Sequence, residues 1–97
     1  MNSAIENLTF LEAFNEYGEV LSDRIRNAVS ERSDSVFIGD IMLYIATILN
    51  NNGWDPSKEP ADKVFSIAKS LIEVVCTFDN ISRLVEFSDD GMYLCFI

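Results

Sequence analysis

Carboxylate side chains are the chemically active groups that this sequence supplies in quantity. Its 97 residues include 16 Asp and Glu against 7 Lys and Arg, for a formal net charge of −9 at pH 7. Four of the carboxylates recur at helical spacing, at Glu12, Glu16, Glu19 and Asp23, and no Lys or Arg precedes Arg24. At about 100° per residue they lie roughly opposite the apolar side of the same segment. We therefore expect one outward face of the first helix to be acidic.

This acidic stripe is the strongest candidate for a binding surface. Like charges four residues apart destabilise a helix by a few tenths of a kcal/mol per pair, and selection for stability alone would intersperse lysines. A negative field repels nucleic acid and anionic lipid, whereas it attracts cationic protein surfaces and speeds encounter with them. The stripe thus predicts a basic protein partner, without direct nucleic-acid binding or membrane contact. Simple solvation of an outer helix face is the competing interpretation, which the sequence leaves open.

A second candidate binding surface lies near the end of the chain. Asp89, Asp90 and Tyr93 stand next to an apolar C-terminal segment, and carboxylates around an exposed aromatic ring are common at protein interfaces. We expect Asp89 and Asp90 to be exposed. The competing interpretation is that the apolar residues of this segment cap the core, namely Met92, Leu94 and Phe96.

Catalytic constellations are missing from the sequence. There is no histidine, which removes the commonest general base, the commonest metal ligand and every Ser-His or Cys-His nucleophile pair. The four glycines are isolated, so no phosphate-binding loop is present. Cys76 and Cys95 form no CxxC pair, and neither has a nearby basic residue that would lower the pKa of its thiol. We expect a protein that is not an enzyme and uses neither a cofactor nor a metal ion.

The cysteines and the first residues also bear on location. Two reduced thiols in apolar contexts are typical of a cytosolic protein. Residues 1–8 lack the basic start and apolar run of a signal peptide. The longest apolar stretch, residues 36–49, is interrupted by Gly39 and Asp40 and is too short to span a bilayer. We expect a cytoplasmic protein.

The pattern predicts a single domain over residues 1–97, without repeats or linkers. Two capping boxes compete to start the first helix, Ser3-Ala-Ile-Glu6 and Thr9-Phe-Leu-Glu12. Periodicity favours the second, so we expect a helix over about 9–30 after a short leader. A second helix over about 35–50, capped by Asp34 or Ser35, is apolar on nearly all sides and therefore central. Asn50-Asn-Asn-Gly53 ends it, with Gly53 or an Asn in the left-handed cap conformation. Trp54 is either an interface residue or the apolar contact that follows such a cap, and the second interpretation is favoured. The role of Asp40 in this helix is undecided.

The remainder predicts a third helix and a hairpin. The helix covers about 60–79, with Pro60 in its first turn. The hairpin covers about 82–97, with Asp90-Gly91 as a type I′ turn. Because a lone hairpin is marginal in water, it must pack on the helices or pair with another strand. The expected fold class is α+β, predominantly α: three helices packed around the second helix, with a C-terminal β-hairpin.

Three hypotheses for function follow from size and charge. The leading one is an inhibitor of a cationic protein, in the form of an immunity protein that covers the basic active site of a nuclease toxin. The second is a phage-encoded mimic of nucleic acid, of the anti-CRISPR or anti-restriction type, whose carboxylates stand in for phosphates. The third is a non-catalytic adapter or oligomer subunit, including a homodimer, that uses the hairpin to add a strand to another chain.

Overall fold

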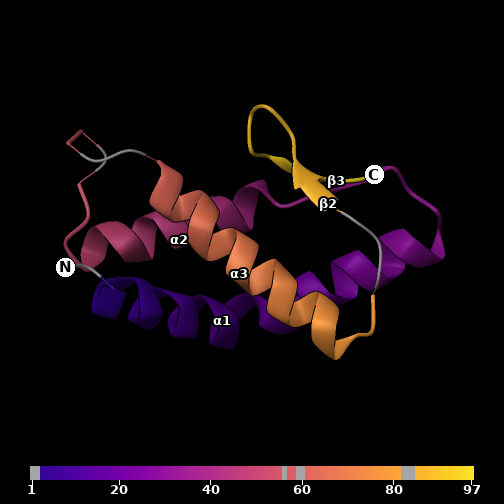
Figure 1. Ribbon diagram of the computed structural model, residues 1–97, viewed down its shortest axis with the longest axis horizontal. Coiled ribbons are helices and arrows are strands. Elements are labelled where there is room, and N and C mark those ends of the chain that lie inside the picture. Colours follow the sequence, from indigo (N-terminus) through magenta and orange to yellow (C-terminus); the bar gives the residue numbers. More distant parts are fainter. Residues whose placement is uncertain (1–2, 56, 59–60, 82–84) are drawn as a thin grey trace.

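The chain forms helices and one antiparallel sheet over the residues that the computed structural model describes, 3–55, 57–58, 61–81 and 85–97 (Figure 1). Its elements in order are α1 (Ser3–Ser30), β1 (Ser35–Phe37), α2 (Gly39–Asn51), α3 (Asp62–Phe78), β2 (Val85–Phe87) and β3 (Tyr93–Phe96). The fold class is α+β and mostly α, as the sequence predicts. Pro60 and residues 82–84, which were expected in the third helix and the hairpin, lie outside the described residues.

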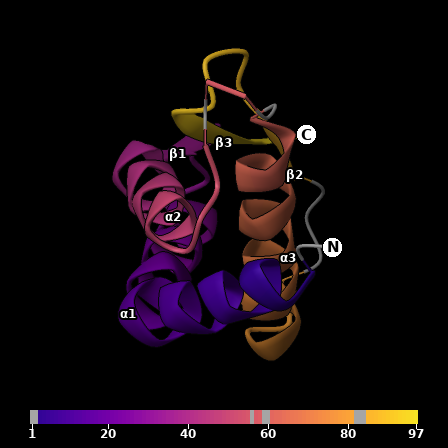
Figure 2. The ribbon, with the colours of Figure 1, turned by 90° about the vertical axis from the view of Figure 1, so that its left-hand side faces the viewer.

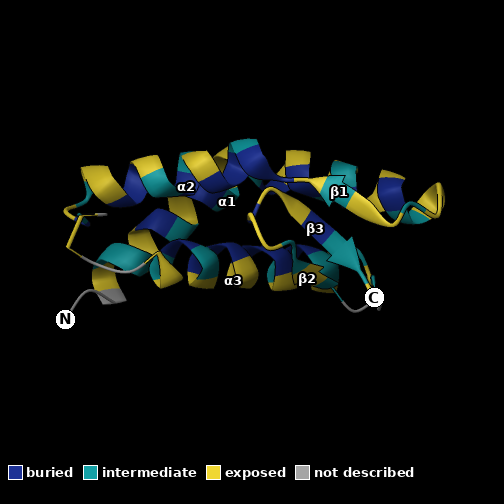
Figure 3. Ribbon diagram, turned by 90° about the horizontal axis from the view of Figure 1, so that it is seen from above, coloured by how far each residue is buried: buried dark blue, intermediate teal, exposed yellow. Residues whose placement is uncertain are grey.

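The three helices pack against one another, and the sheet lies over α2 and α3. Each helix contacts both of the others, with α1 running beneath α2 and α3 (Figure 2). Buried positions line the inner sides of all three helices and the inner face of β3 (Figure 3). The largest fully buried apolar side chains are Leu21, Ile25, Ile38, Ile45, Leu49, Leu71 and Leu94. α2 belongs to this core on one side only, since Leu43 on its outer side is 70% exposed.

The first helix begins earlier than the sequence predicts. Residues 3–8 continue α1 without a break, so the expected leader does not exist as a separate turn. Thr9 is not a cap: it is fully buried within the helix, and its hydroxyl donates to the Ile5 carbonyl at 2.8 Å. The same hydroxyl accepts a hydrogen bond from the Asn52 amide at the end of α2, at 3.1 Å. The helix thus begins at the competing capping box Ser3-Ala-Ile-Glu6, which periodicity did not favour, and the packing of Ile5 against the core helps to hold the extra turn.

The segment before α2 is a strand, so the prediction of a helix from residue 35 is wrong. Val36 pairs with Leu94 in an antiparallel ladder, and the sheet order is β1-β3-β2. The hairpin therefore finds its additional strand within its own chain. Gly39, which follows, has no room for a side chain, because a Cβ atom would lie 2.6 Å from the Met92 sulfur and 2.7 Å from the Phe37 ring. β1 can thus pack close to β3 and turn directly into α2.

All three helices end in the same capping motif. After α2, the Trp54 N–H donates to the Leu49 carbonyl and the Gly53 N–H donates to the Asn50 carbonyl, both at 3.0 Å. Gly53 has φ +111°, and Trp54 is buried in the core, which confirms the predicted cap and its apolar contact. The residues at the corresponding positions after α1 and α3 also have positive φ and repeat both hydrogen bonds, with Arg32 (φ +57°) and Asn80 (φ +56°).

The loop between β2 and β3 differs from the predicted type I′ turn. That turn needs positive φ at both central residues, whereas Gly91 has φ +73° and Asp90 does not have positive φ. The Asp90 carboxylate accepts hydrogen bonds from the Ser88 hydroxyl at 2.6 Å and from the Met92 N–H at 3.0 Å. These side-chain contacts hold Asp90 in an Asx-type turn, with Gly91 alone in the left-handed region.

Arg32 is the least suited of the three capping residues, since a non-glycine side chain in the left-handed region costs about 1–2 kcal/mol. Its side chain is exposed. We predict that Arg32→Gly raises the free energy of unfolding by about 0.5–1 kcal/mol, after the greater unfolded-state entropy of glycine is subtracted. Urea denaturation measures the change. Arg32→Ala is the control and should leave stability unchanged; an equal gain from alanine would show that the side chain, not the backbone, is responsible.

Candidate functional site

The predicted acidic stripe lies on the outside of α1. Glu12, Glu16, Glu19 and Asp23 are all exposed, and they extend along about 16 Å of the helix at its rise of 1.5 Å per residue. Within the described residues, no ion pair is recorded for the three glutamates. Asp23 is different, because its carboxylate lies 2.6 Å from the Arg26 guanidinium. Of the four stripe carboxylates, the three glutamates are therefore the ones that no described cation pairs with.

Two tyrosines adjoin this stripe where α1 meets α2. The ring centroids of Tyr17 and Tyr44 are 4.7 Å apart, with their planes inclined by 53°. The pKa of the Tyr44 hydroxyl lies above its usual value, because the surrounding protein desolvates it and the carboxylates of Glu16 and Glu12 repel its charged form. The charges of Glu16 and Glu12 thus act electrostatically on the Tyr44 hydroxyl. We call the four stripe carboxylates with Tyr17 and Tyr44 the acidic face.

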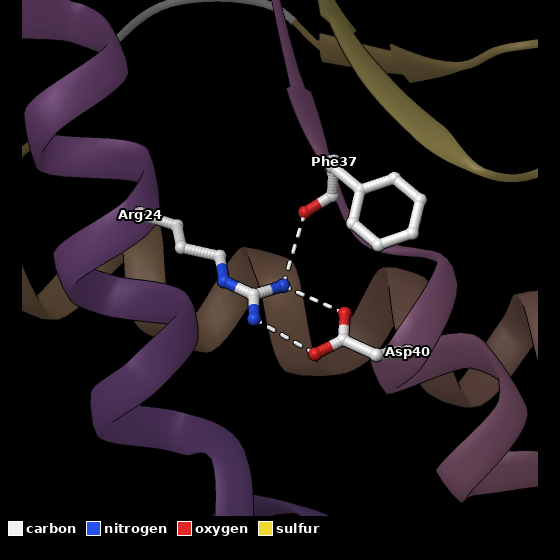
Figure 4. A network of polar contacts seen from close by, with 3 residues as sticks. All are labelled: Arg24, Phe37 and Asp40. Atoms are coloured by element: carbon white, nitrogen blue, oxygen red, sulfur yellow. Dashed lines mark hydrogen bonds and ion pairs between the residues drawn. The ribbon is translucent and has the colours of Figure 1, made fainter.

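Near the tyrosine pair, a network of hydrogen bonds holds α1 against α2. Figure 4 shows this network. The Arg24 guanidinium donates to both oxygens of Asp40, each at 2.7 Å, and also to the Phe37 carbonyl at 3.1 Å. The pKa of the Asp40 carboxyl is held below its usual value, chiefly by its hydrogen bond from Arg24. Asp40 therefore serves as a structural anchor between helices, which settles the role that the sequence left undecided.

The other end of the acidic face borders a hollow between α1 and α3. Glu19 stands at its edge, and the cavity has a volume of about 260 Å³. Inside it, the Asp79 carboxylate accepts a hydrogen bond from the Ser22 hydroxyl and lies 4.0 Å from the Arg26 guanidinium. The Phe78 ring at the rim is 75% exposed. The hollow adds a further carboxylate and an aromatic ring next to the stripe.

The candidates near the C-terminal end lie elsewhere on the molecule. Asp89 and Asp90 are exposed on the β2–β3 loop, which points away from α1 (Figures 1 and 2). The Asp90 carboxylate accepts hydrogen bonds within the loop, and these hydrogen bonds hold the pKa of its carboxyl below the usual value. Tyr93 is 44% exposed and meets the Phe37 ring edge to face, at 5.5 Å between centroids. The predicted site residues therefore form two groups on different parts of the molecule. The stripe residues lie on α1, and Asp89, Asp90 and Tyr93 lie on the sheet and its loop.

The two cysteines form no disulfide, and the environment of Cys76 does not favour a reactive thiolate. Burial raises the pKa of the Cys76 thiol, and the nearby Asp79 carboxylate raises it further. A thiolate nucleophile requires the opposite shift. The described residues contain no group of three or more Cys, Asp or Glu side chains arranged to hold a metal ion. Among these residues there is also no helix with the length and apolarity needed to cross a membrane.

Comparison with protein-family models, with curated proteins and with solved structures found no match for this chain. Any function must therefore be argued from the acidic face and the other surfaces of the molecule themselves.

Sequence reasoning found the stripe and missed the tyrosine pair. Tyr17 and Tyr44 are both half-buried. A signal for this position does exist, because a tyrosine hydroxyl needs water or a polar partner and so favours the boundary of an apolar face. That the two rings meet depends on how α1 crosses α2, which neither helix encodes alone.

The Arg24–Asp40 pair generates a prediction about stability and pH. Asp40→Asn keeps the shape of the side chain and removes its charge, so we expect a loss of about 1 kcal/mol at pH 7, a value reduced for partial exposure. Because the folded pKa of Asp40 is depressed, this contribution is present above the unfolded pKa, near 4, and disappears as pH falls through the folded value. The stability gap between the two proteins should therefore close in strong acid, as measured by urea denaturation at several pH values.

Asp23→Asn is the matched control, since it removes the exposed i,i+3 pair with Arg26. We expect it to cost less than about 0.5 kcal/mol. Equal losses for the two variants would contradict a buttressing role for Asp40.

Proposed function

We propose that this protein is a non-catalytic inhibitor that binds a cationic protein through the acidic face of α1 and α2. Its most specific form is an immunity protein that acts in the cytoplasm and covers the basic active site of a nuclease-type toxin. The observation that carries the proposal is the row of three exposed glutamates, which form no ion pair with a described residue, beside a pair of tyrosines. A cationic cleft would offset the repulsion among these carboxylates. Binding would therefore remove an unfavourable electrostatic term that the free protein retains.

The tyrosine pair favours a specific protein target over general charge mimicry. Phosphate mimicry needs only spaced negative charges, whereas tight protein interfaces combine charge with aromatic anchors that become desolvated. Tyr17 and Tyr44 contribute rigid aromatic surface, and Arg24 with Asp40 holds their two helices in place. Stacking of an arginine side chain from the target on these rings, next to Glu16, fits this combination of groups.

Nucleic-acid mimicry of the anti-CRISPR or anti-restriction type is the second candidate. Its support is the regular spacing of the stripe and the absence of Lys and Arg from residues 1–23. An immunity protein should neutralise one toxin, while a mimic should inhibit several unrelated proteins that bind the same nucleic acid. Inhibition assays against a panel of nucleases and restriction enzymes separate the two.

The central test is charge reversal on the free carboxylates. We predict that the variant Glu12→Lys, Glu16→Lys, Glu19→Lys loses its target, because three attractive contacts become repulsive. The wild type and variant are used for affinity capture, and captured proteins are identified by mass spectrometry. The expected captured protein is basic and nucleic-acid-processing, and stoichiometric wild-type protein should abolish its activity.

A control with the same change in net charge distinguishes the face from the overall field. Glu31→Lys, Asp34→Lys, Asp62→Lys alters three exposed carboxylates outside the acidic face. We expect this variant to retain its target, with slower association at low salt. If both variants lose the target equally, net charge alone explains binding and the acidic face is not the site.

The aromatic part of the site has its own test. We predict that Tyr44→Ala weakens binding to the captured target about 30-fold, which corresponds to a hot-spot residue. Tyr93→Ala removes a tyrosine of the sheet that is more exposed than Tyr44, and should leave affinity unchanged. Titration calorimetry measures both, after urea denaturation confirms that each variant is folded. The reverse ranking would place the interface on the sheet instead of on α1 and α2.

A further inference from the structure

A groove lies between α3 and β2, away from the acidic face. It has a volume of about 640 Å³. One face of α3 forms its first wall, at Lys69, Ile72, Glu73, Cys76 and Thr77. Its other wall is formed by the β2–β3 hairpin and the residue that follows the α3 cap, at Ile81, Val85, Glu86, Phe87 and Leu94. The floor is apolar, and the charged groups stand at the rim.

β2 is an edge strand whose backbone groups are available on the groove side. Glu86 pairs with Cys95, and the Ser88 N–H donates to the Tyr93 carbonyl at 2.9 Å. In an antiparallel ladder the residues that face the neighbouring strand alternate, so Ser88 and Glu86 bond to β3. The N–H and C=O groups of Val85 and Phe87 therefore point outward from the sheet, on the side of β2 where the described chain has no further strand.

The chemistry of the groove restricts what can occupy it. Outward N–H and C=O groups at alternate residues match an extended backbone, which could form up to four hydrogen bonds with Val85 and Phe87. An added strand directs every second side chain into the apolar floor, where Ile72 and Cys76 lie. The remaining side chains would face the rim, where Glu73 and Glu86 outnumber Lys69. A strand with alternating apolar and basic residues satisfies all three requirements.

We propose that this groove binds an extended, alternating apolar-basic segment of a partner protein, which adds to the sheet as a fourth strand beside β2. The bound segment runs along α3, with its apolar side chains on the groove floor and its Lys or Arg side chains at Glu73 and Glu86. This surface is separate from the acidic face, so the inference goes beyond the proposed function and does not depend on it.

The two cysteines provide a direct readout. Cys76 lines the groove, whereas Cys95 belongs to β3 and is not among the lining residues. We use the acetylated and amidated peptide Lys-Val-Lys-Val-Lys-Val-Lys as the probe and follow alkylation of each thiol by mass spectrometry. The expected result is saturable protection of Cys76, by at least fivefold in rate, with Cys95 unchanged. A peptide of the same composition in the order Val-Val-Val-Lys-Lys-Lys-Lys should not protect.

Variants test whether the edge of β2 and the groove are used. Val85→Pro removes one outward N–H and spares the Glu86 bonds to β3, and proline is tolerated at the first residue of an edge strand. We expect it to weaken peptide binding about fivefold to tenfold. Thr77→Trp obstructs the exposed rim without altering β2, and should abolish protection even if Val85→Pro proves unstable. Glu16→Lys, on the acidic face, should have no effect.

Three results would overturn the proposal. Unchanged alkylation of Cys76 with the alternating peptide would show that the groove does not bind such a strand. Equal protection by the block peptide would show attraction to net charge without strand addition. Protection that rises with protein concentration in the absence of peptide would show that a second copy of this chain occupies the groove.

Discussion

The arrangement of α1, β1 and α2 depends on the hydrogen bonds that the Arg24 guanidinium donates. It binds both oxygens of Asp40 and the Phe37 carbonyl, so the corner between β1 and α2 cannot rotate against α1 without breaking three hydrogen bonds. Two surfaces meet at this corner. On one side the fixed helices bring Tyr44 against Tyr17, and on the other side β1 is aligned with β3. The apolar core supplies stability, while this charged pair selects the angle at which its parts meet.

Charge is distributed unevenly along α1, and the two parts of the helix do different work. Its arginines, Arg24 and Arg26, are in its second half, and both engage carboxylates of this chain. Its first half carries glutamates alone. In the second half of α1, both arginines pair with carboxylates, and Arg24 thereby connects the helix to α2. In the first half, the glutamates produce a negative electrostatic field that is directed outward. A single helix can therefore anchor the domain and present a binding surface without the two tasks competing for the same residues.

Most features that depend on one element were predictable, the type of the β2–β3 turn excepted, and features that depend on two elements were not. Helical spacing alone placed Glu12, Glu16 and Glu19 outside, and the glycine cap alone placed Trp54 in the core. The strand at Val36 was missed because its apolar residues run directly into α2, and its partner Leu94 is far along the chain. The Arg24–Asp40 bond and the tyrosine pair were missed for the same reason. Periodicity predicts which face of a helix or strand is buried. Which residues contact each other across two elements depends on how those elements cross.

The position of β3 also sets the order in which the sheet can assemble. It is the last strand in sequence and the middle strand in space. Pairing with β2 closes a loop of a few residues, whereas pairing with β1 joins residues about 60 positions apart, as in Ser35 with Cys95. Short loops close within microseconds, and distant strands meet only after the helices between them have approached. We therefore expect β1 to dock after the β2–β3 hairpin has formed, which leaves one side of β3 open to other strands in the interval.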